Sequence, residues 1–153
     1  ITGLYYFNDG LSLRTYLKHI IDNGIMTKDE YQLTDAMKMM IDSNIPMRAV
    51  EADKWIDCGT HEMLIEANRE LLAMEKRTYF CEGDTDSSSI GDNVSVFGNS
   101  RIIESNVANS IIMENAVIKN CDIKNSVIGR NCTVENFRGR LIASDFTSVT
   151  KED

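Results

Sequence analysis

The segments NVSVFGNSRIIE (93–104), NSIIMENAVIKN (109–120) and NSVIGRNCTVEN (125–136) repeat one another at a spacing of sixteen residues. Asparagine opens each segment, and aliphatic residues occupy the same columns in all three. A repeat of fixed period indicates a solenoid. Within each period the aliphatic residues recur every five or six positions, which predicts three short strands per coil. These positions are Ile90, Val96, Ile102, Val107, Ile112, Ile118, Ile123, Ile128 and Val134.

The spacing of this repeat fits neither a helix nor a lone strand. A helix places apolar residues three and four apart and a strand alternates them, whereas here short β-branched pairs are separated by Asn, Gly, Ser and Asp. Asn and Gly suit corners because they tolerate positive φ, and stacked Asn side chains can bond to one another. About three coils must stack to bury their aliphatic faces, and residues 88–136 provide them. We predict a parallel β-helix over 90–136, rather than antiparallel hairpins, with a linker at 77–89 and a cap or tail at 137–153.

Composition limits the class of protein. The chain has 153 residues with 42% hydrophobic content, enough for a real core, and the repeat separates a C-terminal unit from a different N-terminal one. A net charge of −8 argues against nucleic acid or an anionic membrane as a partner. No apolar run approaches the ~20 residues of a transmembrane helix. The four cysteines form no CxxC pair, and we interpret them as reduced thiols of a cytoplasmic protein.

Helices and extended segments alternate in the N-terminal unit. Residues 1–7 are β-branched and aromatic and predict a strand, and the mostly alternating residues 45–50 predict another. Helices are expected after the capping residues Ser12 and Thr34. A third helix over 61–76 is predicted to begin at Thr60 and to bury the stripe Leu64, Ala67, Leu71 and Met74. Because the chain begins at Ile1 inside an apolar segment, we interpret it as a piece of something longer.

Three stretches, ITGLYYFND, EYQLTDAM and KWIDCGTHEMLIEANRELL, occur in this order before the repeat. Together with the β-helix they resemble the C-terminal half of sugar-1-phosphate nucleotidyltransferases, in particular glucose-1-phosphate thymidylyltransferases and related enzymes with a C-terminal left-handed β-helix. The resemblance covers residues 1–136, and W-x-D-x-G-T followed by a leucine-rich helix is its most specific part. It implies that residues 1–76 are the C-terminal, sugar-side part of an α/β, Rossmann-like nucleotidyltransferase domain, and that the β-helix is left-handed.

The resemblance also implies a reaction. A sugar 1-phosphate oxygen attacks the α-phosphorus of a nucleoside triphosphate, pyrophosphate leaves and a nucleotide-sugar forms. Mg²⁺ and positive side chains neutralise the phosphate charge in such transfers. By motif match, Asp57 is one of two carboxylates that hold the metal. From the residues alone, Asp57 can equally be a carboxylate that precedes a helix and caps its N–H groups.

The opening segment supplies the expected sugar contacts. In the family this motif lines the sugar pocket, so the resemblance gives that role to Ile1, Gly3 and Tyr5, with Glu30 as a further candidate. A plain core strand is the alternative for Ile1. It explains Gly3 less well, because glycine weakens a strand and usually marks close backbone approach.

Several motifs on which the family's activity depends do not occur in these 153 residues. The Gly-rich loop with Arg, a second metal-binding Asp and the Lys of a Glu-Lys-Pro motif are missing, so we predict that the chain is inactive alone. An alternative is a β-helix scaffold that associates with copies of itself, and we expect a homo-oligomer. A hexapeptide acyltransferase is disfavoured because both histidines, His19 and His61, precede the repeat and leave no general base in it.

Overall fold

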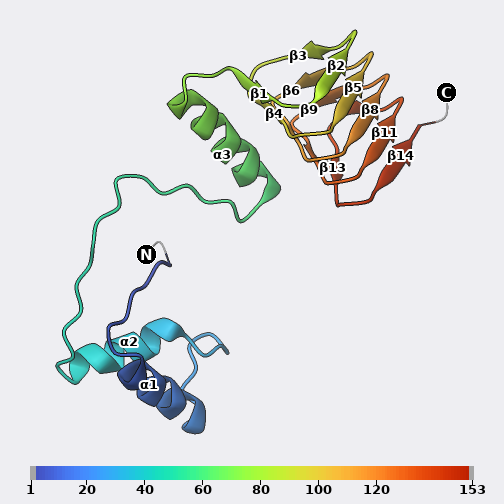
Figure 1. Ribbon diagram of the computed structural model, residues 1–153. Coiled ribbons are helices and arrows are strands. Elements are labelled where there is room, and N and C mark those ends of the chain that lie inside the picture. Colours follow the sequence, from blue (N-terminus) through green and yellow to red (C-terminus); the bar gives the residue numbers. More distant parts are fainter. Residues whose placement is uncertain (1–2, 152–153) are drawn as a thin grey trace. The chain divides into compact units, whose positions relative to one another are not determined.

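The computed structural model describes residues 3–151. The chain divides into two compact units, Ile1–Trp55 and Ile56–Asp153. Within the described residues, the first unit holds two helices and the second holds one helix followed by a parallel β-helix (Figure 1). None of these helices has both the length and the apolar content that crossing a bilayer requires.

In the first unit, α1 (Gly10–Asp22) and α2 (Leu33–Asp42) pack against each other. α1 begins after Asp9, whose side chain accepts hydrogen bonds from two backbone N–H groups, and not after the predicted Ser12. α2 begins after Gln32 without a side-chain cap, which places the predicted capping residue Thr34 inside the first turn. Both helices therefore start earlier than their capping signals suggest. The buried apolar side chains of this pair are Ile20, Ala36 and Met40.

The two strands predicted in the first unit are absent from the described residues. Residues 4–7 and 45–50 belong to no helix or strand and pair with no strand. A strand depends on a neighbour for its backbone hydrogen bonds, and neither segment has one within residues 3–151. Three of their apolar side chains consequently face solvent: Leu4 and Tyr6 are each 89% exposed, and Val50 is 83% exposed.

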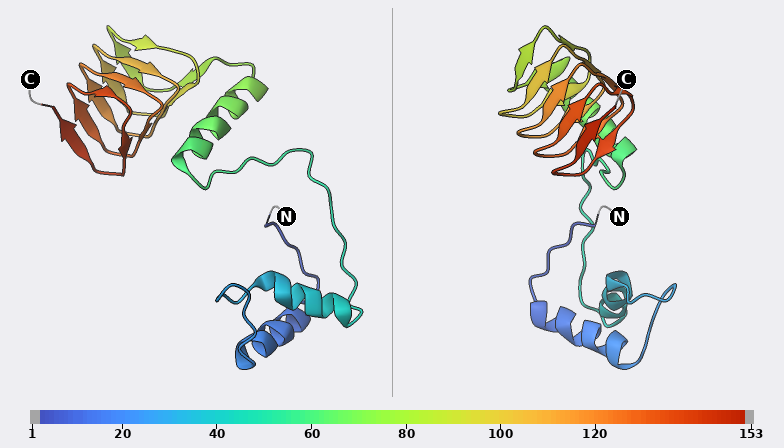
Figure 2. Two further views of the ribbon diagram at one scale, coloured as in Figure 1. Left: turned by 180° about the vertical axis from the view of Figure 1, so that it is seen from behind. Right: turned by 90° about the vertical axis from the view of Figure 1, so that its right-hand side faces the viewer.

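The β-helix of the second unit consists of three parallel sheets, each taking one strand from successive coils (Figures 1 and 2). The first sheet contains β1 (Tyr79–Cys81), β4 (Val94–Val96), β7 (Ile111–Ile112), β10 (Val127–Ile128) and β13 (Ile142–Ala143). The second contains β2 (Asp84–Asp86), β5 (Arg101–Ile103), β8 (Val117–Lys119), β11 (Thr133–Glu135) and β14 (Ser148–Thr150). The third contains β3 (Ser89–Ile90), β6 (Asn106–Ala108), β9 (Asp122–Lys124) and β12 (Arg138–Gly139).

These sheets confirm the predicted β-helix, which makes about 4 turns and is left-handed. Its extent is greater than the repeat predicted. Residues 77–89, expected to be a linker, contain β1 and β2 and form most of the first coil. Residues 137–153, expected to be a cap or tail, contain β12, β13 and β14. The strand ladder therefore runs from Tyr79 to Thr150.

The repeat columns form the interior of the β-helix. Ile118 pairs in register with Ile102 on one side and Val134 on the other, and all three side chains are fully buried. The other two sheets contribute equivalent inward columns, such as Val96, Ile112 and Ile128. Each buried side chain thus contacts the coils above and below it, so that the hydrophobic effect stabilises the stack as a whole.

Asparagines occupy the corners between strands, as the sequence predicts. Eight asparagines of the β-helix adopt positive φ: Asn93, Asn99, Asn109, Asn115, Asn120, Asn125, Asn131 and Asn136. Two stacked pairs also join side chain to side chain. Asn109 Nδ2 lies 2.6 Å from Asn125 Oδ1, and Asn120 Nδ2 lies 2.8 Å from Asn136 Oδ1. Asparagine therefore supplies both the left-handed turn and a hydrogen bond between coils.

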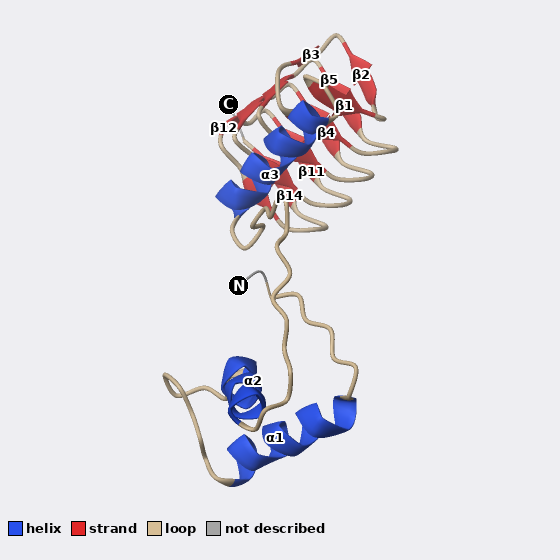
Figure 3. Cartoon of the chain, turned by 90° about the vertical axis from the view of Figure 1, so that its left-hand side faces the viewer, coloured by secondary structure: helices blue, strands red, loops and turns tan. Residues whose placement is uncertain are grey.

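The remaining helix, α3 (His61–Met74), lies alongside the stacked strands (Figure 3). Its buried residues include Ile65 and Leu72, whereas Leu71 and Met74 of the predicted buried stripe are 55% and 61% exposed. The predicted face is therefore right at Ala67, which is buried, and at Leu64, which is half-buried, and wrong at Leu71 and Met74. The helix turns Asn68 toward the β-helix instead, where it bonds to the β4 region.

Candidate functional site

Asp57 lies in the turn that leads into α3. Its Oδ1 accepts a hydrogen bond of 2.8 Å from the backbone N–H of Gly59. The next residue, Thr60, caps the helix as predicted, because its Oγ1 accepts a hydrogen bond of 3.2 Å from the N–H of Met63. The sequence W-I-D-C-G-T thus folds into two consecutive side-chain-capped turns, with the Asp57 carboxylate exposed at the start of the helix.

Gly59 gives the Asp57 carboxylate the space it occupies. A Cβ atom built on Gly59 would lie 3.1 Å from Asp57 Oδ1, closer than ordinary van der Waals contact. A larger residue would push the carboxylate away from the N–H group to which it bonds. The glycine of the motif therefore helps to hold the carboxylate in the turn.

The donor type at Asp57 suits Mg²⁺, which prefers carboxylate oxygens and is often bound by one or two carboxylates together with substrate phosphates. The described residues contain no cluster of three or more His, Cys, Asp or Glu side chains that could hold a metal ion. Asp57 can therefore supply one of the ligands of a Mg²⁺ ion, and the described residues around it supply no cluster of others. The hydrogen bond of Asp57 goes to the N–H of Gly59, which precedes the helix, whereas the side chain that caps α3 is that of Thr60.

The predicted sugar contacts lie in the first unit. Ile1 falls outside the described residues. Gly3 is exposed and has a φ of +82°, a conformation that favours glycine. Tyr5 is half-buried, and its ring centroid lies 6.4 Å from that of Phe7. Glu30 is exposed and accepts a hydrogen bond of 3.0 Å from Gln32 Nε2.

Glu30 also closes a tight turn that the sequence did not predict. Thr27 and Glu30 exchange backbone hydrogen bonds of 2.9 and 3.2 Å around Lys28 and Asp29. Both central residues have positive φ, 54° and 63°, although neither is glycine. Aspartate tolerates this conformation but lysine rarely adopts it, so no turn signal was visible in the sequence.

Sequence reasoning also missed the polar contacts that hold α3 on the β-helix. Asn68 Nδ2 donates to the carbonyl of Asn93 at 3.0 Å, and the buried Ser95 hydroxyl donates to Asn68 Oδ1 at 2.5 Å. In the first turn of α3, the Arg140 guanidinium donates to the Glu62 carboxylate. That hydrogen bond lowers the pKa of Glu62 below its ordinary value. Glu62 and Arg140 lie 78 residues apart in the sequence, so no local sequence pattern predicts their hydrogen bond.

The cysteines differ in their exposure to solvent. All four are free thiols: Cys58 is exposed, Cys81 is half-buried, and Cys121 and Cys132 are buried inside the β-helix. Burial raises the pKa of the Cys121 thiol. A thiol with a raised pKa is a poor nucleophile, because the thiolate is the reactive form. Cys121 therefore acts as a packing residue.

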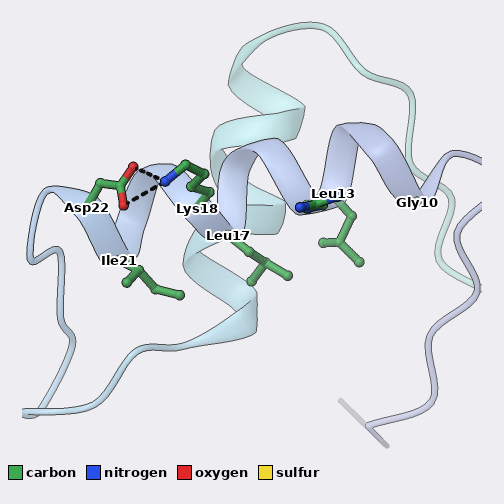
Figure 4. A pocket seen from close by; sticks show the side chains of 7 residues that line it. Gly10, Leu13, Leu17, Lys18, Ile21 and Asp22 are labelled. Carbon is green, nitrogen blue, oxygen red and sulfur yellow. Dashed lines mark hydrogen bonds and ion pairs between the residues drawn. The ribbon is translucent and has the colours of Figure 1, made fainter.

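A shallow groove lies along α1 in the first unit (Figure 4). Leucine and isoleucine side chains line it, with the ion pair of Lys18 and Asp22 at one end. The groove contains none of the predicted site residues.

Comparison with known proteins gives no assignment. No protein-family model matches the chain, and no curated protein matches it.

Proposed function

We propose that the chain is the sugar-side and β-helix portion of a sugar-1-phosphate nucleotidyltransferase. The complete protein would convert a nucleoside triphosphate and a sugar 1-phosphate into pyrophosphate and a nucleotide-sugar of the dTDP-glucose kind. One observation carries the proposal: the first unit exposes two apolar extended segments that have no partner in the described chain. We infer that this unit is one part of a larger α/β domain, and the motif W-x-D-x-G-T begins at its last residue, Trp55.

The imbalance between buried and exposed apolar groups in this unit is large. Only three hydrophobic side chains are buried among its described residues. Against these, ten large ones are exposed: Leu4, Tyr6, Leu11, Ile21, Ile25, Met26, Tyr31, Ile41, Val50 and Trp55. Burying one such side chain contributes about 1.5–3 kcal/mol. A further polypeptide segment that pairs with residues 4–7 and 45–50 would recover the part of this free energy that belongs to Leu4, Tyr6 and Val50.

Within the proposed enzyme, Asp57 provides one carboxylate oxygen for Mg²⁺. When bound, the metal neutralises phosphate charge that develops during the transfer. The remaining ligands would come from phosphates, water and a carboxylate of the completing segment. The contribution of this chain is to hold Asp57 in a fixed turn, through Gly59 and the capped start of α3.

The sugar contacts in the proposed enzyme come from the opening segment. Gly3 presents a backbone without a side chain, which permits a sugar to approach closely, and Tyr5 offers an aromatic ring beside it. Glu30 offers a carboxylate that can accept hydrogen bonds from sugar hydroxyls. These assignments follow the motif ITGLY and the exposure of Glu30.

The chain alone would be inactive, because the nucleotide-binding motifs do not occur in its sequence. The second candidate function is a β-helix scaffold that forms a homo-oligomer. The last coil favours it, because its strands β12, β13 and β14 each lie at the end of a sheet and pair with no further strand within the described residues. Sedimentation of the purified chain tests association, and a pyrophosphate-release assay separates the enzyme from the scaffold.

The direct test is pyrophosphate release by the complete protein, supplied with glucose 1-phosphate, each nucleoside triphosphate and Mg²⁺. We expect metal-dependent release with one preferred triphosphate. Asp57→Asn should reduce turnover by at least about 100-fold, because the asparagine lacks the metal-binding charge, while Cys58→Ser serves as the matched control and should retain activity. Retained turnover in Asp57→Asn contradicts the ligand assignment, and absence of release with every triphosphate contradicts the function.

A further inference from the structure

Two separate polar contacts hold α3 on the β-helix. Near the middle of the helix, Asn68 bonds to residues of the second coil at Asn93 and Ser95. In its first turn, Glu62 pairs with Arg140, which lies between β12 and β13. The helix therefore runs along the stack, with its start beside the C-terminal coils and its end near β1.

The Asp57 turn is built onto this same first turn. Thr60 caps the helix, and the Asp57 carboxylate bonds to the N–H of Gly59. The carboxylate is therefore coupled to the start of α3 by two short hydrogen-bonded turns. Any change in the position of the first turn of α3 would move the carboxylate with it.

We propose that Arg140 is a positioning residue for Asp57, acting through Glu62 at the start of α3. The last part of the β-helix thereby sets the direction in which the chain presents its carboxylate. The functional consequence rests on the proposed role of Asp57 in binding Mg²⁺, whereas the mechanical coupling stands on the geometry of this unit alone. Both side chains are about half exposed, 50% and 65%, so the pair contributes little to overall stability.

Hydrogen exchange on the intact chain tests the coupling. In Arg140→Gln, we expect the amides of residues 59–63 to exchange about two- to five-fold faster, while the thermal melting of the β-helix stays within error of the wild type. Arg130→Gln is the matched control, because Arg130 forms a similarly exposed ion pair with Glu114 within the β-helix. That variant should leave exchange at 59–63 unchanged. Unchanged exchange in Arg140→Gln overturns the proposal.

Metal dependence in the complete protein tests the consequence. Arg140→Gln should raise the Mg²⁺ concentration needed for half-maximal pyrophosphate release by about two- to five-fold, and the charge-reversed pair Arg140→Glu with Glu62→Arg should restore it. An active variant with unchanged Mg²⁺ dependence overturns the positioning role. If the wild-type protein releases no pyrophosphate at all, the proposed function fails, and the exchange experiment alone then decides whether Arg140 orients the turn.

Discussion

Replacing Ile118 by alanine tests the β-helix at its centre. Ile118 is fully buried between Ile102 and Val134 of the neighbouring coils. The substitution removes three carbon atoms, worth roughly 2.4 kcal/mol at about 0.8 kcal/mol each. A rigid stack closes poorly around the gap, and the resulting cavity adds about 1–2 kcal/mol. We expect the free energy of unfolding of the β-helix to fall by about 3–4 kcal/mol.

Urea unfolding followed by far-UV circular dichroism measures this loss. With a slope of about 2 kcal/mol per M, the midpoint should fall by roughly 2 M urea. Two controls frame the result. Lys119→Ala, an exposed change at the next residue, should cost no more than about 0.5 kcal/mol. Val149→Ala in the last coil, half-buried and paired in register only with Val134, should cost about 1 kcal/mol. A loss in Ile118→Ala no larger than that in Lys119→Ala would refute the stacked-column account.

Three further predictions concern the last corner, the docked helix and pH. Phe146 is 78% exposed and has a φ of 61°, at a corner that is asparagine in the three preceding coils. Because asparagine adopts this conformation more easily, Phe146→Asn should stabilise the β-helix by about 0.5–1 kcal/mol in the same urea assay. An unchanged free energy of unfolding would contradict this prediction. Asn68→Ala leaves the buried Ser95 hydroxyl without its partner and should cost about 1–3 kcal/mol, and a neutral result would show that α3 docks without it. Because pairing lowers the pKa of Glu62, its stabilisation is complete above the ordinary glutamate value of about 4.3 and is lost as pH falls below it. Glu62→Gln should therefore exchange faster than the wild type at the amides of residues 59–63 near neutral pH, and this difference should disappear in acid; a difference that persists there would contradict the ion pair.

The β-helix could be predicted from the sequence because its inward residues repeat at one spacing. The spacing of sixteen residues is not kept in the first and last coils, and these are the coils that the sequence analysis assigned to a linker and to a cap or tail. In the first coil, Cys81 pairs with Val96, 15 residues later, whereas Thr85 pairs with Ile102, 17 residues later. Val134 and Val149 in the last two coils are again 15 residues apart. Strands that add to an existing stack tolerate such shifts, because the neighbouring coil supplies their hydrogen bonds.

The errors in the N-terminal half have a different cause. The stripe predicted for α3, Leu64, Ala67, Leu71 and Met74, fails at its last two positions, because a sequence pattern assigns buried positions by hydrophobicity alone. The helix instead turns the half-buried Asn68 toward the β-helix, where its partner Ser95 lies 27 residues away in the sequence. Among the site residues, the cap at Thr60 and the position of Asp57 before α3 follow from local sequence. Arg140 does not, since its contact depends on the tertiary fold.

Hydrogen exchange of the isolated chain most directly tests the central proposal, that the β-helix is joined to a unit whose extended segments pair with further polypeptide. We expect slow exchange throughout the paired strands between Tyr79 and Thr150, and fast exchange at residues 4–7 and 45–50, which pair with no strand in the described chain. Adding the completing segment, in the complete protein, should then protect both segments. Strong protection of residues 4–7 and 45–50 in the isolated chain would contradict the claim and remove the principal support for the proposed function.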